Sequence, residues 1–377
     1  MVRKKLLFLM PSMVGGGAER TLINLLHKID YSKYEIDLVI VCNKGVYLNQ
    51  IPDEVKLTAL FKNDFFVRVL AYLQKRVGFT IIFRWAIKKK ITKDYDLGIS
   101  FLDGNFTDLL FFIKGLKRRV AWVHSSYKSY RNFARFYENE HYKNKLKINR
   151  YGKLDTICFV SHDSMSEFLE VFGTYTSMEV IYNLIDAEAV KLKATKNQIV
   201  KSGTFTFIAL GSLLPVKGFD RLIRASKIVR DTGFTFNVQI VGKGNEEQNL
   251  RRLIKLENLD NVVSILGFYD NPYPLLLTAD AFIMSSVSEA LPTVLCEAMI
   301  LGKPVIVTNC SGCKELVDNE KYGLLAEQND DSLANKMITY LTNPSLLEAY
   351  SKKALERAKL FDDTEMLNAY YRIFDKI

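Results

Sequence analysis

Two glutamates, Glu289 and Glu297, lie eight residues apart around the start of an expected helix. The apolar run 281–284 predicts a buried strand, and a loop leads from it to the helix Pro292–Leu301, with Gly302 after its end. Nearly every residue of this helix is apolar, so the helix should be buried, and a buried carboxylate needs a partner. A carboxylate at Glu297 suits the vicinal hydroxyls of a sugar such as ribose.

The start of the same helix offers donors for phosphate. The N–H groups of Thr293 and Val294 precede the first full turn and therefore have no acceptor within the helix. The helix dipole favours negative charge there, and Lys217, in the loop after an earlier expected strand, would add a full positive charge. Glu297 lies one turn beyond Thr293 on the same face. These residue types together indicate a site for a phosphate-bearing ligand.

A turn of three glycines follows the first expected strand, residues 5–10. Residues 15–17 let backbone N–H groups approach a ligand closely, and the helix that should start near Ala18 favours negative charge. The dinucleotide-binding pattern fails here, because Arg20 takes the place of its third glycine and no acidic residue ends the next strand. We therefore expect neither a nicotinamide nor a flavin cofactor.

Apolar runs alternate with helical segments in both halves of the chain, which predicts two doubly wound α/β domains. Residues 191–203 are polar and lack periodicity, so they should form the linker. We predict domains over residues 1–195 and 196–361, with the last helix, 362–377, packed back on the first domain. Ligands bind beyond the carboxyl ends of parallel strands. The two domains should therefore face each other across a cleft.

Composition places the chain among ordinary soluble proteins, with 48% hydrophobic and 25% charged residues among 377. No run is long enough to span a bilayer, and none resembles a signal peptide. Five scattered cysteines favour a reducing compartment. Cys310 and Cys313 form one CxxC without a second pair to complete a zinc site, so we expect no metal. These features predict a cytoplasmic protein.

The formal net charge of +10 is concentrated in two stretches of the first half. Residues 61–93 hold nine Lys and Arg against one Asp, and residues 114–153 hold twelve against two Glu. Such stretches indicate an anionic membrane, a phosphate-bearing substrate or a nucleic acid. Residues 65–91 predict two basic amphipathic helices broken at Gly78, which suits an anionic membrane surface. An ordinary core-facing helix with a solvated basic face is the alternative.

Several motifs together resemble the family 4 retaining glycosyltransferases, which have the GT-B fold. The resemblance covers almost the whole chain and includes the glutamate pair as an E-x7-E signature. The other matching pieces are Gly15–Glu19, Val180–Asp186, Gly211–Gly218, Val241–Gly244 and Leu266–Phe268.

The resemblance implies a UDP- or GDP-linked sugar donor, no metal, and transfer with retention at the anomeric carbon. Glu297 would bind the ribose, Glu289 would hold sugar hydroxyls near the reacting carbon, and Lys217 would stabilise the departing diphosphate. His124, after the strand 120–123, stands where the family often has a histidine near donor sugar and acceptor; a histidine packed under a loop is the alternative. The implied donor-binding residues are Gly16, Gly17, Ser212, Gly242, Gly244, Phe268, Pro292, Thr293, Val294 and Glu297.

Three positions need separate interpretation. Ser212 stands where the family usually has an arginine, and Lys243 or Arg20 is our hypothesis for the replacement. Phe268 suits either a nucleobase or the core. The sequence 94–96 matches the DxD of metal-dependent transferases but precedes its strand, at the wrong end of the sheet for a ligand.

We therefore expect a hexosyl- or N-acetylhexosaminyltransferase that acts on a lipid-linked glycan in surface-polysaccharide synthesis, for example of capsule or O-antigen. It would sit peripherally at the inner face of the cell membrane, held through 61–93 and 114–153. The same fold acting on a soluble sugar or sugar phosphate is one alternative. A non-catalytic nucleic-acid-binding protein is another, but the basic stretches contain no recognised reading module.

Overall fold

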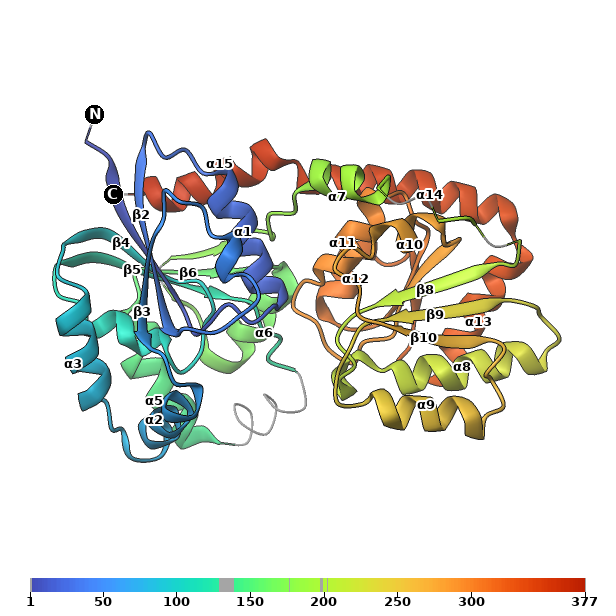
Figure 1. Cartoon of the computed structure of the whole chain (residues 1–377), viewed down its shortest axis with the longest axis horizontal. Coiled ribbons are helices and arrows are strands. Elements are labelled where there is room, and N and C mark those ends of the chain that lie inside the picture. The colour runs from blue at the N-terminus through green and yellow to red at the C-terminus, as the bar shows by residue number, and fades with distance from the viewer. Residues whose placement is uncertain (1, 129–138, 176, 197–198, 202, 377) are drawn as a thin grey trace. The chain divides into compact units, whose positions relative to one another are not determined.

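The computed structural model describes residues 2–128, 139–175, 177–196, 199–201 and 203–376. The chain forms two compact units, Met1–Leu184 with Thr364–Ile377, and Ile185–Asp363 (Figure 1). The predicted α/β class with two doubly wound domains is confirmed.

The predicted linker is wrong at its start. Residues 187–194 form helix α7 (Ala187–Ala194), which packs on α10 and α11 of the second unit and buries Val190 and Ala194. The division between the units therefore falls after Leu184, ahead of the helix and not after it.

The first unit is built on seven parallel strands in the order β3-β2-β1-β4-β5-β6-β7. The order reverses between β1 and β4, as in doubly wound sheets, and this places a switch point at their carboxyl ends. The strands are β1 (Lys4–Met10), β2 (Tyr34–Cys42), β3 (Lys56–Phe61), β4 (Tyr95–Ser100), β5 (Leu116–Val123), β6 (Thr156–Phe159) and β7 (Met178–Val180). Its helices are α1 (Gly17–Lys28), α2 (Asp64–Val77), α3 (Ile81–Lys90), α5 (Glu140–Asn149), α6 (His162–Phe172) and α15 (Asp363–Asp375).

The second unit has six parallel strands in the order β10-β9-β8-β11-β12-β13, with its switch point between β8 and β11. The strands are β8 (Thr206–Leu210), β9 (Asn237–Val241), β10 (Val263–Gly267), β11 (Ala281–Met284), β12 (Val305–Thr308) and β13 (Leu324–Ala326). The helices besides α7 are α8 (Phe219–Asp231), α9 (Glu247–Leu256), α10 (Tyr273–Thr278), α11 (Thr293–Ile300), α12 (Ser311–Val317), α13 (Asp330–Thr342) and α14 (Pro344–Ala358). Figure 1 shows α8 and α9 on one side of this sheet and α10 to α12 on the other.

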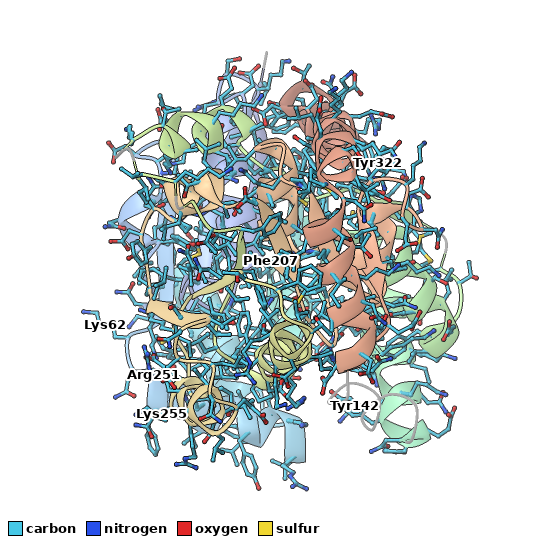
Figure 2. All side chains as sticks on the ribbon, turned by 90° about the vertical axis from the view of Figure 1, so that its right-hand side faces the viewer. Lys62, Tyr142, Phe207, Arg251, Lys255 and Tyr322 are labelled. Atoms are coloured by element: carbon cyan, nitrogen blue, oxygen red, sulfur yellow. The ribbon has the colours of Figure 1, made fainter. Side chains whose placement is uncertain are left out.

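Each sheet buries an apolar core that fixes its strands. In the second unit Phe207 of β8 is fully buried, and it is labelled among the packed side chains in Figure 2. In the first unit the last helix of the chain completes the core. Tyr370 of α15 stacks on Trp122 with ring centroids 4.9 Å apart, and Phe374 meets Phe8 edge to face at 6.0 Å.

Short 3-10 segments connect several elements. They are Leu48–Gln50, Thr107–Phe112, Tyr151–Lys153, Pro215–Lys217 and Lys359–Phe361. Two of these segments contribute to the candidate active site described below. Pro215–Lys217 contains the predicted Lys217, and Tyr151–Lys153 contains the buried Tyr151.

Candidate active site

The predicted lysine and the first predicted glutamate form an ion pair. Lys217 Nζ lies 2.6 Å from Glu289 Oε1, and the Ser286 hydroxyl donates to the same carboxylate oxygen at 2.7 Å. The two charged side chains are 20% and 13% exposed, so the pair is largely shielded from water. Charges that are shielded in this way interact more strongly than charges at the surface. The structure thus joins residues 72 positions apart in the sequence.

The loops that carry this pair are tied together by backbone contacts. The Val287 N–H donates to the Val216 carbonyl at 2.8 Å, and the Ser285 hydroxyl donates to the Lys217 carbonyl at 2.9 Å. Arg221, from α8, donates to the Ser285 carbonyl at 2.9 Å. Because β8 and β11 are neighbouring parallel strands, their carboxyl-end loops meet at one edge of the sheet, and the lysine and glutamate are held there.

Glycine is required where these loops touch. Gly218 has a left-handed φ of 61°, and a Cβ on it would lie 2.2 Å from the Ser285 carbonyl oxygen. Any larger residue would therefore push apart the two loops that bear Lys217 and Glu289.

Helix α11 begins where the sequence predicts phosphate donors. Pro292 is its N-cap residue, not its first helical residue, and the helix runs from Thr293 to Ile300. The Leu295 and Cys296 N–H groups turn back to the Pro292 carbonyl, at 3.1 and 3.3 Å. The N–H groups of Thr293 and Val294 thus lie at the positive end of the helix, as the sequence predicts.

Glu297 lies in the second turn of α11 and is only 8% exposed. The residues around it on the helix, Leu295, Cys296 and Ala298, are fully buried. The carboxylate therefore sits at the boundary between the core and the surface, one turn from Thr293. The sugar-hydroxyl role of Glu297 stays a prediction.

Gly242 and Gly244 have a packing function that the sequence does not reveal. A Cβ on Gly242 would lie 1.8 Å from the Gly211 carbonyl oxygen, and one on Gly244 would lie 2.2 Å from that of Leu213. The Leu213 N–H donates to the Lys243 carbonyl at 2.9 Å. These glycines let the loops after β8 and β9 join edge to edge, and their predicted contact with a donor stays a prediction.

Lys243 and Phe268 meet at the same edge of the sheet. The Lys243 ammonium lies 4.4 Å from the centre of the Phe268 ring, which is a cation–π distance. Phe268 is 58% exposed, so it does not belong to the core. Ser212, which stands at the position of the usual arginine, lies in the loop beside Lys243. The hypothesis that Lys243 replaces this arginine is therefore consistent with the structure and stays a prediction.

The glycine turn before α1 lies against the carboxylate of Glu19, which belongs to the first turn of the same helix. Gly16 is the N-cap of α1, and a Cβ on it would lie 2.5 Å from Glu19 Oε2. Burial raises the pKa of Glu19, while the backbone N–H groups of Glu19 and Gly16 favour its charged form. The predicted anion-binding N–H groups at Gly16 and Gly17 thus adjoin Glu19. Arg20 stacks on Tyr47 at 4.4 Å and donates to Gln50 at 3.2 Å.

His124 lies directly after β5, with its ring 5.2 Å from that of Phe101. The residue is partly exposed, but its Nε2 is buried and meets no hydrogen-bond partner among the described residues. Burial lowers the pKa of His124 to about 3, so the imidazole is neutral at physiological pH. The ring donates a hydrogen bond to the Phe101 backbone, so its Nε2 can accept a hydrogen bond from a sugar hydroxyl, but it offers no positive charge to a diphosphate.

Replacing His124 with Asn should make the protein less sensitive to acid. Because the folded-state pKa lies below the ordinary 6.5, the stability that depends on neutral His124 is complete above about pH 6.5 and is lost as the pH falls towards 3. We expect the wild type to lose about 2 kcal/mol more than the variant between pH 7.5 and 4.5, measured by urea unfolding. His27→Asn, at an exposed histidine, is the control. Equal losses in wild type and His124→Asn would contradict the buried neutral state.

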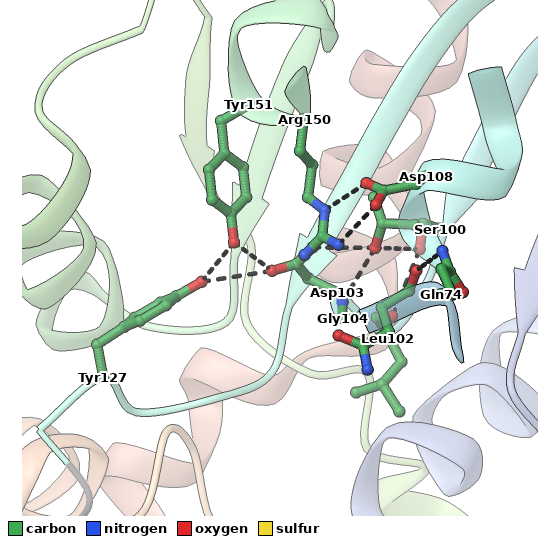
Figure 3. A network of polar contacts seen from close by, with 11 residues as sticks. Gln74, Ser100, Leu102, Asp103, Gly104, Asp108, Tyr127, Arg150 and Tyr151 are labelled. Atoms are coloured by element: carbon green, nitrogen blue, oxygen red, sulfur yellow. Dashed lines mark hydrogen bonds and ion pairs between the residues drawn. The ribbon is translucent and has the colours of Figure 1, made fainter. Parts of the chain in front are cut away.

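The loop after His124 is clamped by buried polar groups that the sequence did not single out. Glu167 of α6 accepts from the Ser126 hydroxyl at 2.8 Å and from the Tyr127 N–H at 2.7 Å. Figure 3 shows the Tyr127 and Tyr151 hydroxyls converging on Asp103, at 3.4 and 2.8 Å.

Arg150 closes the same network. It is 3% exposed and forms a bidentate pair with Asp108, with distances of 2.6 and 3.1 Å (Figure 3). Its guanidinium also lies 3.9 Å from Asp103. The contacts of this buried arginine with two carboxylates, one of which also accepts from the two tyrosines, therefore hold the carboxyl edge of the first sheet near His124 in place. The one available sequence signal was Asp103, a polar residue just after a buried strand.

The DxD sequence at residues 94–96 lies at the amino end of its strand, where ligands do not bind in such sheets. Asp96 is the second residue of β4 and accepts from the Lys5 N–H at 2.9 Å and from Lys117 at 2.7 Å. It thus belongs to the amino end of the sheet, opposite the ligand-binding edge. The described residues also contain no cluster of three or more His, Cys, Asp or Glu side chains that could hold a metal ion.

Two family models match adjacent parts of the sequence. Residues 15–189 match the model described as Glycosyltransferase Family 4, and residues 191–357 match Glycosyl transferases group 1. The chain is a family 4 glycosyltransferase. The GT-B fold that the resemblance implies is thereby confirmed.

Curated relatives agree with this assignment. The glycosyltransferase is 25% identical to an uncharacterized glycosyltransferase of Haemophilus influenzae, over 92% of its own length and 93% of the relative. It is 32% identical to a Campylobacter jejuni enzyme over 59% of its own length and 61% of that chain. The name of the Campylobacter protein is N-acetylgalactosamine-N,N'-diacetylbacillosaminyl-diphospho-undecaprenol 4-alpha-N-acetylgalactosaminyltransferase.

A solved structure shares the fold along the whole glycosyltransferase. The Anabaena protein HepE, in complex with UDP and glucose, superposes with a TM-score of 0.77 over 100% of both chains, at 18% identity. Identity this low shows the shared fold alone.

Proposed function

We propose that this glycosyltransferase moves a hexosyl or N-acetylhexosaminyl group from a UDP- or GDP-linked sugar to a lipid-linked glycan in surface-polysaccharide synthesis. The observation that carries the proposal is the shielded Lys217–Glu289 pair beside the start of α11, in a chain of this family. The name of the Campylobacter relative describes an acceptor on diphospho-undecaprenol and the transfer of an N-acetylgalactosaminyl group, which supports both the acceptor class and the sugar class.

The proposed chemistry follows from where charge develops. Breaking the bond between sugar and diphosphate leaves negative charge on the phosphate and an oxocarbenium-like sugar. Lys217 and the N–H groups at the start of α11 would stabilise the leaving diphosphate, and the Glu289 carboxylate would hold sugar hydroxyls beside the reacting carbon. We propose retention of anomeric configuration and no metal requirement, since these protein groups can supply the positive charge that the leaving group needs. Turnover that ceases with EDTA and returns with Mg²⁺ would refute the second point.

Neutral His124 would contribute a hydrogen bond near the acceptor side. Its buried Nε2 lies at the carboxyl edge of the first sheet, where the network around Asp103 holds its loop in place. A neutral imidazole suits a hydroxyl and not a phosphate, so we assign it to a sugar.

A screen of nucleotide sugars tests the activity. We expect one UDP- or GDP-sugar to be hydrolysed slowly in the presence of the protein and to be transferred rapidly when a polyprenyl-diphosphate-linked glycan is added. Product analysis by mass spectrometry identifies the sugar and the acceptor. Transfer to a free sugar or sugar phosphate in place of the lipid-linked glycan would favour the soluble-acceptor alternative. No turnover of any nucleotide sugar would refute the transferase.

The surface of α2 supports peripheral binding to an anionic membrane. The predicted break between two basic helices is confirmed, because Gly78 ends α2 with a left-handed φ of 70° and α3 starts at Ile81. Val67 and Leu70 of α2 face the core, while Phe65 and Tyr72 are 76% and 59% exposed. A solvated basic face alone does not account for these exposed aromatic side chains. Since no described helix has the length and hydropathy of a bilayer-spanning segment, we propose attachment through this surface at the inner face of the membrane.

Vesicle flotation should detect this attachment. We expect the wild type to float with phosphatidylglycerol vesicles at low salt, and Phe65→Ser with Tyr72→Ser to reduce binding at least 10-fold, because each aromatic ring is worth about 1.5–3 kcal/mol when buried. The control is Leu192→Ser with Leu256→Ser, which removes two exposed apolar side chains from the second unit. If the wild type does not float, the membrane proposal fails and the transferase proposal stands.

A further inference from the structure

A pocket of 520 Å³ joins the two basic stretches of the first unit. Lys75 and Arg76 line it from the last turn of α2, and His141, Tyr142 and Lys145 line it from α5, together with Asn139, the N-cap of α5. Figure 1 shows α2 and α5 side by side. The pocket thus gathers cationic side chains from segments more than 60 positions apart in the sequence.

No acidic side chain among the described residues neutralises the cations of this pocket. None of the lining residues is acidic, and no ion pair with Lys75 or Lys145 is found among the described residues. Arg76 has only a cation–π contact with Tyr72, at 5.8 Å. Two other basic residues on the same helices are paired, Arg68 with Asp64 and Lys143 with Glu140.

Like charges that share a pocket repel one another, and an anion that enters it removes this repulsion. The start of α5 adds the positive end of a helix dipole to the same wall. Asn139 and Tyr142 carry neutral hydrogen-bonding groups. Three cations with such groups suit a ligand that carries two or more negative charges, such as a diphosphate.

Two exposed apolar side chains of α2 adjoin the pocket-lining Arg76, Tyr72 by a cation–π contact at 5.8 Å and Val77 as its neighbour in the sequence. Tyr72 and Val77, next to Lys75 and Arg76 on α2, are 59% and 72% exposed. A ligand with a diphosphate and a hydrocarbon chain would place the first in the pocket and the second along α2.

We infer that this pocket binds the diphosphate of a lipid-linked acceptor, with the adjoining lipid against Tyr72 and Val77. The inference rests on the proposed function, because it supplies a binding site for the acceptor class proposed there. An acidic phospholipid headgroup is the other source of the same phosphate chemistry, and the experiment separates the two.

Direct binding of farnesyl diphosphate tests the inference without any turnover. The pocket variant is Lys75→Gln, Arg76→Gln and Lys145→Gln together. The matched control is Lys191→Gln, Arg252→Gln and Lys255→Gln, which removes the same charge from exposed positions of the second unit. Figure 2 shows Lys255 at the surface. Both variants should keep the thermal unfolding temperature of the wild type, since the six side chains are exposed.

We expect the dissociation constant of farnesyl diphosphate, measured by titration calorimetry, to rise at least 10-fold in the pocket variant and less than 2-fold in the control. Farnesyl monophosphate should bind the wild type more weakly. Because Lys75 and Arg76 also lie on the proposed membrane-binding helix α2, flotation with phosphatidylglycerol vesicles should fall in the pocket variant and not in the control, whereas farnesyl diphosphate binding in solution reports on the pocket alone. An equal loss in the two variants, or unchanged farnesyl diphosphate binding in the pocket variant, overturns the inference. Loss of vesicle binding alone in the pocket variant also overturns it and assigns the pocket to phospholipid.

These outcomes are distinct from failure of the proposed function. If the nucleotide-sugar screen finds no transfer, farnesyl diphosphate binding still reports on the pocket. If transfer occurs but the pocket variant keeps the acceptor KM of the wild type, the function stands and the inference falls.

Discussion

Glu289→Gln is expected to lower kcat for sugar transfer about 10³-fold while leaving the affinity for the nucleotide almost unchanged. The glutamine has nearly the same shape and can still accept the Ser286 hydroxyl bond, so the loop should keep its structure. What it removes is the negative charge beside the reacting carbon, and loss of one preorganised electrostatic group costs about 10²–10³ in rate. Single-turnover kinetics with saturating donor measures the chemical step directly.

The ion pair between Glu289 and Lys217 also predicts how the two single variants and the double variant compare. Lys217→Met alone should also reduce kcat strongly, because the leaving diphosphate loses its cation. Since Lys217 Nζ and Glu289 Oε1 are 2.6 Å apart, the double variant should be less impaired than the product of the two single effects. Glu348→Gln, at an exposed carboxylate, is the control. A rate for Glu289→Gln within 3-fold of the wild type would refute the proposed role.

Glu297→Gln is expected to abolish most of the thermal stabilisation that the nucleotide donor confers. A carboxylate that accepts from two ribose hydroxyls forms charge-assisted bonds worth about 1.5–3 kcal/mol each, so we expect the dissociation constant for the nucleotide to rise about 10–100-fold. The change should appear with the nucleotide diphosphate alone, since the ribose is present without the sugar.

The comparison with Glu289→Gln separates the two carboxylates. The Glu289 variant should bind the nucleotide normally and react slowly, whereas the Glu297 variant should bind weakly and regain part of its rate at high donor concentration. If every donor stabilises wild type and Glu297→Gln equally, Glu297 is a structural acid on a buried helix, and the ribose assignment is wrong.

Much of the fold follows from local patterns. Residues 281–284 and 305–308 are short runs of apolar residues bounded by turns, and both are strands with those bounds. Elements without such a pattern were not predicted. Helix α12 (Ser311–Val317) has seven residues and contains glycine, and β13 (Leu324–Ala326) has three, so both are too short for a repeated apolar pattern to be recognised in the sequence.

The predicted linker shows why domain boundaries are harder to predict. Helix α7 has the polar sequence of a linker, and only Val190 and Ala194 among its residues are buried. Its place in the second unit depends on contacts with α10 and α11, which lie far along the chain. Local composition contains no information on such contacts.

The site was predictable in its residue types and not in its contacts. The sequence indicates a lysine and a glutamate for phosphate and sugar, but their direct pairing depends on β8 and β11 being neighbours in the sheet. Ser286 and Arg221, which fix that pair, have no distinguishing pattern in the sequence. Gly242 and Gly244 also have a packing function that the sequence does not reveal, because a glycine that permits loop packing looks the same in sequence as one that permits ligand approach.

Helix α15 has a consequence for the order in which the protein is made. Its Tyr370 and Phe374 cover Trp122 and Phe8 of the first unit, yet they are synthesised only after the whole second unit. Domains usually fold during synthesis from the N-terminus onward. Here the first unit must wait, with an uncovered aromatic surface, until the whole second unit has been translated. Until α15 is made, this aromatic surface of the first unit is therefore a site at which the chain can aggregate.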